Sequence, residues 1–215
     1  ALTTDGKVTA WGWNGHGQTD IPASLAGKSV TAISAGYYHA LALASDGTVT
    51  AWGDNAYGQA SVPSSLAGKR VIAISAGAYH SIALAADGTV TVWGSNTYGQ
   101  LNVPASLAGK TVTAISAGYW HSLALASDGT IIAWGYNKYG ELNIPASLAG
   151  KTVTSVAAGD AFSLVLTSDG TVTTWGDDSY RKVELPASLA GQKVTSIAAG
   201  EVHALAIVQV PPSES

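Results

Sequence analysis

The chain has 215 residues, of which 47% are hydrophobic, so it is long and apolar enough to bury a core and is not a disordered segment. Only 11% of the residues are charged and the net charge is −4, which gives no electrostatic basis for binding DNA or RNA. The absence of cysteine excludes disulfides, zinc–thiolate sites and thiol catalysis, and no apolar run approaches the ~20 residues of a membrane span. We therefore expect neither a nucleic acid nor a membrane as partner.

The sequence begins at Ala1 and contains neither methionine nor cysteine. No signal peptide is visible, and removal of one would explain the missing first methionine. A chain without these two oxidisable residue types suits an extracellular environment. We therefore expect a secreted protein.

A tryptophan-glycine step recurs along the whole chain, in stretches such as "AWGDNAYGQ" and "VWGSNTYGQ". Its tryptophans are Trp11, Trp52, Trp93, Trp134 and Trp175, each 41 residues after the one before. A constant period of this size is typical of a repeat architecture.

The sequence of each repeat predicts four short strands, and the third copy serves as the example. Residues 121–125, "HSLAL", alternate between leucine and small residues, which indicates a strand. The turn "SDGT" follows and predicts a hairpin, because its glycine supplies a positive φ. A second strand runs over residues 130–134, and after the loop "GYNKYG" a short strand ends at Pro145. The segment "VTSV" then begins the inner strand of the next repeat.

These elements predict an all-β fold, a β-propeller of five four-stranded blades. The last copy stops near Ile207 and residues 1–12 resemble its missing half, so we expect one split blade to close the ring through both chain ends. The propeller would cover residues 1–208, and the tail 209–215 is expected to be disordered. A closed ring predicts a monomer, whereas an open array of repeats predicts an end-to-end dimer.

The repeat resembles one propeller family more than others. The dipeptide expected of WD40 blades is missing, and kelch periods are nearer ~50 residues. The stretch "AGYYHALALASDGTVTAWGDNAYGQ" is similar to the regulator of chromosome condensation repeat, and the connector "VPASLAG" resembles secreted bacterial members of that family, of the type II β-lactamase-inhibitory kind. The resemblance implies a propeller that binds a protein through aromatic loop residues. Familiar members have seven blades, whereas five repeats stand here.

Comparison between the copies separates scaffold positions from variable ones. The five tryptophans are invariant, so we expect them to pack between blades. We expect His39, His80, His121 and His203 to act as hydrogen-bonding locks, since Phe162 replaces the histidine in the fourth copy and a ring of metal ligands would not tolerate that change. Asn14, Asn55, Asn96 and Asn137, with Asp178 in the fourth copy, are expected to shape their loops through backbone hydrogen bonds.

Nearly all the variation between the copies falls in two loops per repeat. Because consecutive strands run in opposite directions, these two loops are expected on one face of the propeller, and the "SDG" turns and "PASLAGK" connectors on the opposite face. Aromatic side chains with a polar tip, close to acids, are typical of recognition surfaces. About half of these tyrosines are also expected to pack loop against loop. The predicted partner-binding residues are Trp13, Tyr37, Tyr38, Tyr57, Tyr79, Tyr98, Tyr119, Trp120, Tyr136, Tyr139, Asp54 and Asp160.

The sequence favours a non-catalytic module that binds a protein through this face, with no cofactor and no metal. A glycan-binding propeller and a repeat scaffold without a specific partner are the alternatives. An enzyme is a weaker hypothesis, because Asp160, Asp177 and Asp178 are the only acids dense enough for a glycosidase pair, and adjacent aspartates are more typical of a turn. Nucleotide exchange on a small GTPase is implied by the resemblance alone.

Overall fold

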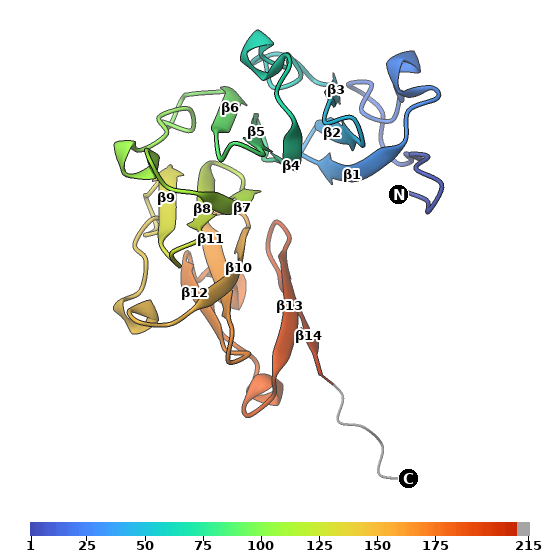
Figure 1. The fold of residues 1–215 in the computed structure, drawn as a ribbon. Helices are drawn as coiled ribbons and strands as arrows, with labels where there is room; N and C mark the ends of the chain where they lie inside the picture. The colour runs from blue at the N-terminus through green and yellow to red at the C-terminus, as the bar shows by residue number, and fades with distance from the viewer. Residues whose placement is uncertain (210–215) are drawn as a thin grey trace.

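The computed structural model describes residues 1–209, which form an all-β structure of five sheets that follow one another along an arc (Figure 1). The strands are β1 (Val30–Ala35), β2 (His39–Ala44), β3 (Val49–Gly53), β4 (Val71–Ala76), β5 (His80–Ala85), β6 (Val90–Gly94), β7 (Val112–Ala117), β8 (His121–Ala126), β9 (Ile131–Gly135), β10 (Val153–Ala158), β11 (Phe162–Thr167), β12 (Val172–Gly176), β13 (Val194–Ala199) and β14 (Ala204–Val208). The short 3₁₀ helices are η1 (Ala23–Leu25), η2 (Ser64–Leu66), η3 (Ala105–Leu107), η4 (Ala146–Leu148), η5 (Ser179–Arg181) and η6 (Ala187–Leu189). No helix of residues 1–209 is long and apolar enough to cross a membrane.

Each complete sheet is an antiparallel meander of three consecutive strands, so the predicted hairpin at "SDG" is confirmed. In the third sheet Leu123 pairs with Ser116 on one side and with Ala133 on the other. The last sheet contains only β13 and β14. The prediction of four strands per blade is wrong for the described residues, because the segment before each connector forms turns and a 3₁₀ helix after its proline instead of a ladder.

The core lies between successive sheets rather than within one. Leucines on the middle strand of one sheet pack against the alanines and the tryptophan of the next, as Leu41 and Leu43 do with Ala83 and Trp93. The tryptophans of the four complete sheets are 3 to 8% exposed, which confirms the predicted role for four of the five; for Trp11, which is 73% exposed, the prediction is wrong. Each also donates its indole N–H to a backbone carbonyl of the preceding repeat, as Trp134 does to Gln100 at 2.8 Å.

Buried histidines hold neighbouring sheets together. His39, His80 and His121 each place Nε2 2.9 Å from the hydroxyl of a serine 42 residues later in the chain, the serines being Ser81, Ser122 and Ser163. Both partners are buried in every pair. This confirms the hydrogen-bonding role for three of the four histidines, whereas His203, directly before β14, is exposed.

The predicted closure of the ring is not present. Residues 1–12 do not add a strand to β14; residues 1–9 pair with themselves through a bridge between Leu2 and Val8. Thr9 accepts a hydrogen bond from the Ala1 amino group at 2.7 Å, so backbone groups that β14 would need are already bonded. The two ends of the arc remain apart in Figure 1, and Leu205 and Ile207 on β14 are each 64% exposed. The predicted disordered tail lies outside the described residues, apart from Gln209.

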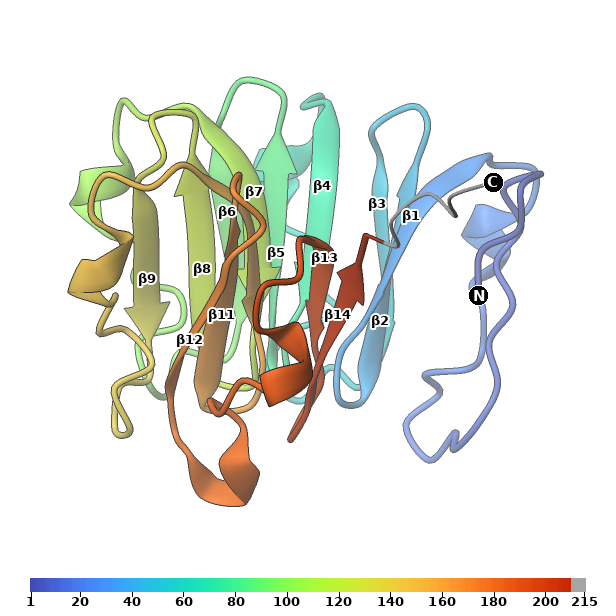
Figure 2. The same ribbon diagram turned by 90° about the horizontal axis from the view of Figure 1, so that it is seen from below.

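The two ends of the sheets carry different chain segments, as Figure 2 shows with the strands standing side by side. At one end, each of the first four connectors is tied to the Asp-Gly turn of the next sheet by an ion pair, such as Lys110 with Asp128 at 2.6 Å. At the opposite end, His39 pairs with Gly53 across β2 and β3, so the loop before His39 and the loop after Gly53 lie together. We call this second end the loop face.

Candidate functional site

The first loop of each repeat is a four-residue turn that presents two side chains on the loop face. In the third copy the N–H of Gly118 donates to the carbonyl of His121 at 2.9 Å, and Tyr119 and Trp120 stand between them. A Cβ on Gly118 would lie 2.4 Å from the carbonyl oxygen of Gly159 in the next repeat. Only glycine fits this close approach of two backbones, so the turn holds its two display residues in place.

The second loop is built by an asparagine and a buried glutamine. The side-chain oxygen of Asn96 accepts the N–H of Leu101 at 2.9 Å, which confirms the predicted loop-shaping role for this asparagine. Gln100 is fully buried and its side-chain oxygen accepts the N–H of Tyr98 at 2.8 Å. The carbonyl of Tyr79 in the first loop accepts the N–H of Ser95 at 2.8 Å, which joins the two loops. Scaffold residues therefore fix the backbone of each displayed tyrosine.

These loops bring all ten predicted aromatic residues into one connected array, which we call the aromatic face. Its members are Trp13, Tyr37, Tyr38, Tyr57, Tyr79, Tyr98, Tyr119, Trp120, Tyr136 and Tyr139, and every ring has another member's centroid within 4.2 to 6.3 Å. The rings of Tyr79 and Trp120 stack at 4.8 Å with an interplanar angle of 20°. Contacts of this kind rigidify side chains that already have few rotatable bonds.

The aromatic face remains open to solvent although its rings touch. Trp13 and Tyr57 are 60% and 55% exposed, and Tyr37, Tyr98 and Tyr139 are between 42 and 47% exposed. The array runs from Trp13 through the first three repeats without a break, and it ends where the fourth and fifth copies carry no ring in the first loop.

The two predicted acids have different environments. Asp54 accepts a hydrogen bond from the side chain of Gln59 at 2.8 Å and another from the N–H of Ala56, so it supports its own loop. Asp160 is half-buried and stands in the first loop of the fourth repeat, where its N–H donates to the carbonyl of Glu201. Burial raises the pKa of the Asp160 carboxyl.

The acids considered for a glycosidase pair do not form one. Asp177 is bonded to the ammonium of Lys182 at 2.7 Å, and the Lys182 side chain is only 2% exposed. The hydrogen bond from Lys182 lowers the pKa of Asp177, which favours a permanent ion pair over proton transfer. Asp178 is exposed and makes no side-chain cap bond.

An axial hollow of about 220 Å³ opens between the first loops of the repeats. Its walls are the alanine-glycine steps at the ends of the inner strands, together with Tyr37, Ala78, Tyr119, Asp160 and Glu201. These five residues occupy the same position in successive repeats, 41 residues apart.

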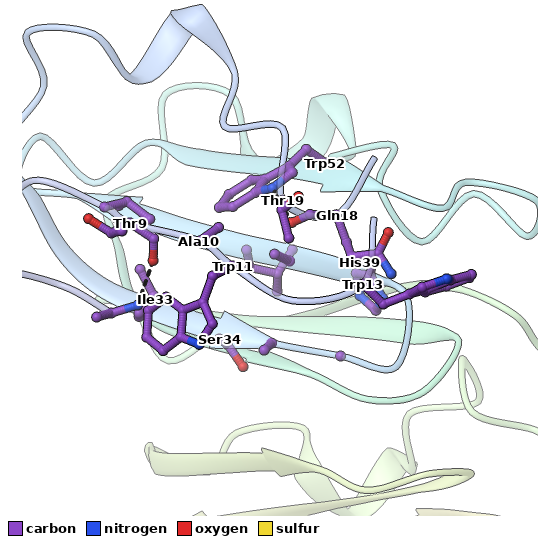
Figure 3. A pocket seen from close by; sticks show the side chains of 16 residues that line it. Thr9, Ala10, Trp11, Trp13, Gln18, Thr19, Ile33, Ser34, His39 and Trp52 are labelled. Atoms are coloured by element: carbon purple, nitrogen blue, oxygen red, sulfur yellow. Dashed lines mark hydrogen bonds between the residues drawn. The ribbon is translucent and has the colours of Figure 1, made fainter. Parts of the chain in front are cut away.

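A second pocket, of about 270 Å³, lies on a face of the first sheet, between that sheet and the N-terminal residues (Figure 3). It is lined by N-terminal residues, among them residues 8–11, Trp13 and Gln18, on one side and by β1, β2 and Trp52 on the other, with Trp11 and Ile33 lying close together. Trp11 is 73% exposed, whereas its equivalents are buried between sheets. Because the same positions form the packed core at the other sheet interfaces, we assign this pocket to an unfilled sheet interface and not to a ligand.

The repeat model described as "Regulator of chromosome condensation (RCC1) repeat" matches the chain in five segments, residues 1–18, 30–59, 71–100, 112–141 and 153–181. The chain belongs to the RCC1 repeat family. No curated protein matches the sequence significantly.

Several solved structures share this fold. Prp20p from Saccharomyces cerevisiae superposes with a TM-score of 0.78 at 22% identity over 97% of this chain and 67% of its own. The ectodomain of the receptor kinase CR4 from Physcomitrella patens gives a TM-score of 0.75 at 22% identity over 97% and 55%, and human WBSCR16 gives 0.73 at 22% over 86% and 59%. The chain thus spans between about half and two thirds of the length of these proteins.

Two side chains of the loop face were absent from the predicted binding set. His16 lies 4.7 Å from Tyr38 and 5.2 Å from Trp13, and it takes the position that Tyr57 holds in the next repeat, which is the signal that identifies it. Glu201 lines the axial hollow and is the repeat equivalent of Asp160.

Proposed function

We propose that this RCC1-family chain is a non-catalytic binding module that holds a protein partner on the aromatic face. The observation that carries the proposal is the continuity of ten contacting rings, half of them more than 40% exposed. Binding hot spots are enriched in tryptophan and tyrosine, since these side chains bury large areas at a small loss of rotamer entropy. Rings that already support one another lose little further freedom when a partner arrives.

Related propellers agree with a protein partner. Prp20p is described with binding properties toward Gsp1p and histones, and the same yeast protein has been solved bound to Kap60. Those partners belong to that protein; what the fold contributes here is a rigid scaffold that carries variable loops on one face. A protein surface, which is broad and mixed in character, matches a broad aromatic array better than a small ligand does.

A selection of phage-displayed random peptides on the immobilised chain tests the proposal. We expect the enriched peptides to lose at least tenfold in affinity with Tyr79→Ala and with Trp120→Ala, because each removes a stacked ring from the centre of the array. Tyr180→Ala is the matched control: Tyr180 lies on the equivalent loop, is 81% exposed and is not part of the array.

Two results would contradict the proposal. In the first, peptides bind equally well to all three variants. In the second, they are lost only on substitution at the opposite end of the sheets, for example with Lys110→Ala. Enrichment on a glycan array together with no enriched peptide would favour a glycan ligand instead.

A further inference from the structure

The axial hollow has a composition that scaffold requirements do not explain. Equivalent positions of the five repeats place Tyr37, Ala78, Tyr119, Asp160 and Glu201 around it. A position that accepts aromatic, small and acidic residues is not required for packing, whereas the alanine-glycine steps below it are repeated in every copy. The scaffold therefore leaves these five positions free to determine what the hollow can receive.

The five residues around the hollow form an aromatic side and an acidic side. The ring centroids of Tyr37 and Tyr119 are 5.5 Å apart, and both rings contact Tyr79, so the aromatic side is continuous with the aromatic face. Asp160 and Glu201 supply two carboxylates from neighbouring repeats on the other side, joined by a hydrogen bond between their backbones.

The negative charge at the hollow is not balanced by the cation beside it. Lys182 is bonded to the Asp177 carboxylate and also donates to the backbone carbonyl of Asp160. Burial raises the pKa of Asp160; Lys182 opposes this effect, while Glu201 and Asp177 add to it. The site thus carries excess negative charge beside electron-rich ring faces, which is the environment that attracts an organic cation.

The size of the hollow limits the occupant further. About 220 Å³ is below the ~300 to 1,000 Å³ of pockets that enclose a whole small-molecule ligand, but it has room for the end of one long side chain. A bare metal ion is a poorer match, because tyrosine rings offer cation–π contacts rather than metal ligands and only two carboxylates are present.

We propose that the axial hollow receives a lysine or arginine side chain of the protein partner. Its charged end would lie between the rings of Tyr37 and Tyr119 and the carboxylates of Asp160 and Glu201, while the surrounding partner surface lies on the aromatic face. This inference deepens the proposed function and rests on it for the identity of the occupant. It predicts that partners carry a protruding basic residue at the centre of their contact surface.

The first test uses small probes on the whole ¹⁵N-labelled chain. Nα-acetyl-arginine methylamide and Nα-acetyl-lysine methylamide are titrated against Nα-acetyl-norleucine methylamide, a neutral probe of similar length. We expect the cationic probes to shift the amide signals of Gly36, Gly118 and Gly159, which line the hollow, and norleucine to leave them unchanged. Equal shifts by all three probes, or none by the cations, would overturn the proposal.

A charge-matched pair of double variants makes the assignment specific. Asp160→Asn with Glu201→Gln should weaken the arginine probe at least tenfold, because both carboxylates are removed while side-chain size is kept. Asp178→Asn with Glu184→Gln removes two acids from the outer loop of the fourth repeat and should leave the probe affinity unchanged. The same spectra establish that each variant is folded. Equal weakening by the two pairs would reduce the effect to net charge and refute a defined site.

The peptide selection separates this inference from the proposed function. Enriched peptides that depend on Trp120 and carry a basic residue whose contribution vanishes in the Asp160→Asn, Glu201→Gln variant support both. Peptides that depend on Trp120 without such a residue overturn the hollow as a cation site and leave the binding function intact. Cationic probes that bind while no peptide depends on Trp120 would reject the aromatic face and retain the hollow.

Discussion

The buried histidines between sheets should make this protein lose stability in mild acid. Burial lowers the pKa of His39 and His121 to about 4 and that of His80 to about 3. An unfolded chain protonates its histidines near pH 6.5, so between pH 6.5 and about 4 the unfolded state binds more protons. Stability contributed by the neutral histidines is therefore complete above pH 6.5 and falls as the pH drops toward 4.

The size of the effect follows from these values. Consider one histidine whose pKa is 6.5 in the unfolded chain and about 4 in the folded protein. Lowering the pH from 7.5 to 5 reduces the free energy of unfolding by about 2 kcal/mol, because at pH 5 this histidine is protonated in the unfolded chain but mostly neutral in the folded protein. Three such groups give about 6 kcal/mol, a large part of the ~5 to 15 kcal/mol that stabilises a typical domain. Burial of Glu141 raises its pKa and offsets part of this loss.

The fourth repeat shows how one of these buried histidines can be replaced. In the fourth repeat Phe162 replaces the histidine, and the position 42 residues later is Ala204 instead of serine. The double variant His121→Phe with Ser163→Ala copies that arrangement. We expect its loss of stability between pH 7.5 and 5 to be about 2 kcal/mol smaller than that of the unmodified chain, measured by urea unfolding with tryptophan fluorescence. Ser163→Ala alone should cost about 1 to 3 kcal/mol at pH 7.5, because the His121 ring loses its partner. An acid-induced loss that is the same in the double variant and in the unmodified chain would refute the assignment.

The loops of the third and fourth repeats offer further tests, each measured as a change in the free energy of unfolding. Arg181 has φ 59° at a position where the other repeats carry glycine, so Arg181→Gly should stabilise the chain by up to about 1 kcal/mol. Gly140→Ala, at the equivalent position with φ 87°, should destabilise the chain by about 1 kcal/mol. Changes of the opposite sign would contradict the argument from backbone strain. Lys182→Ala should cost about 3 kcal/mol because it leaves Asp177 uncompensated, while Lys182→Gln should cost far less because it recreates the aspartate–glutamine pair of another repeat. Gly118→Ala should cost more than Gly140→Ala, since its Cβ would meet a backbone carbonyl; equal costs would mean that the first loop can move.

Much of the fold was predictable because repetition supplies comparisons within one chain. The 41-residue period identified the strands around His121 and Trp134, the "SDG" hairpin and the common end of the two variable loops. The gathering of ten aromatic residues followed from that shared end. The fourth strand was mispredicted because alternation before Pro145 is too short to distinguish an edge strand from the turns and the 3₁₀ helix that are present.

The features that were not predicted depend on contacts between side chains and between loops, which the repeat period does not reveal. Asp54 looked like a displayed acid, but the glutamine five residues later holds it within its loop. Closure was expected from sequence halves that match, whereas the hairpin of residues 1–9 uses its own hydrogen bonds. Glu201 became informative only once the first loops were seen to surround a common hollow.

The histidine–serine bonds also determine how such a gene can change by unequal crossing-over between its repeats. Deletion of the second repeat would bring His39 against Ser122, and the buried ring would keep a hydroxyl partner. Deletion of the fourth would bring His121 against Ala204, and the ring would lose it. The first three repeats are therefore interchangeable at this interface, whereas the fourth cannot be lost without leaving the His121 ring without its hydroxyl partner.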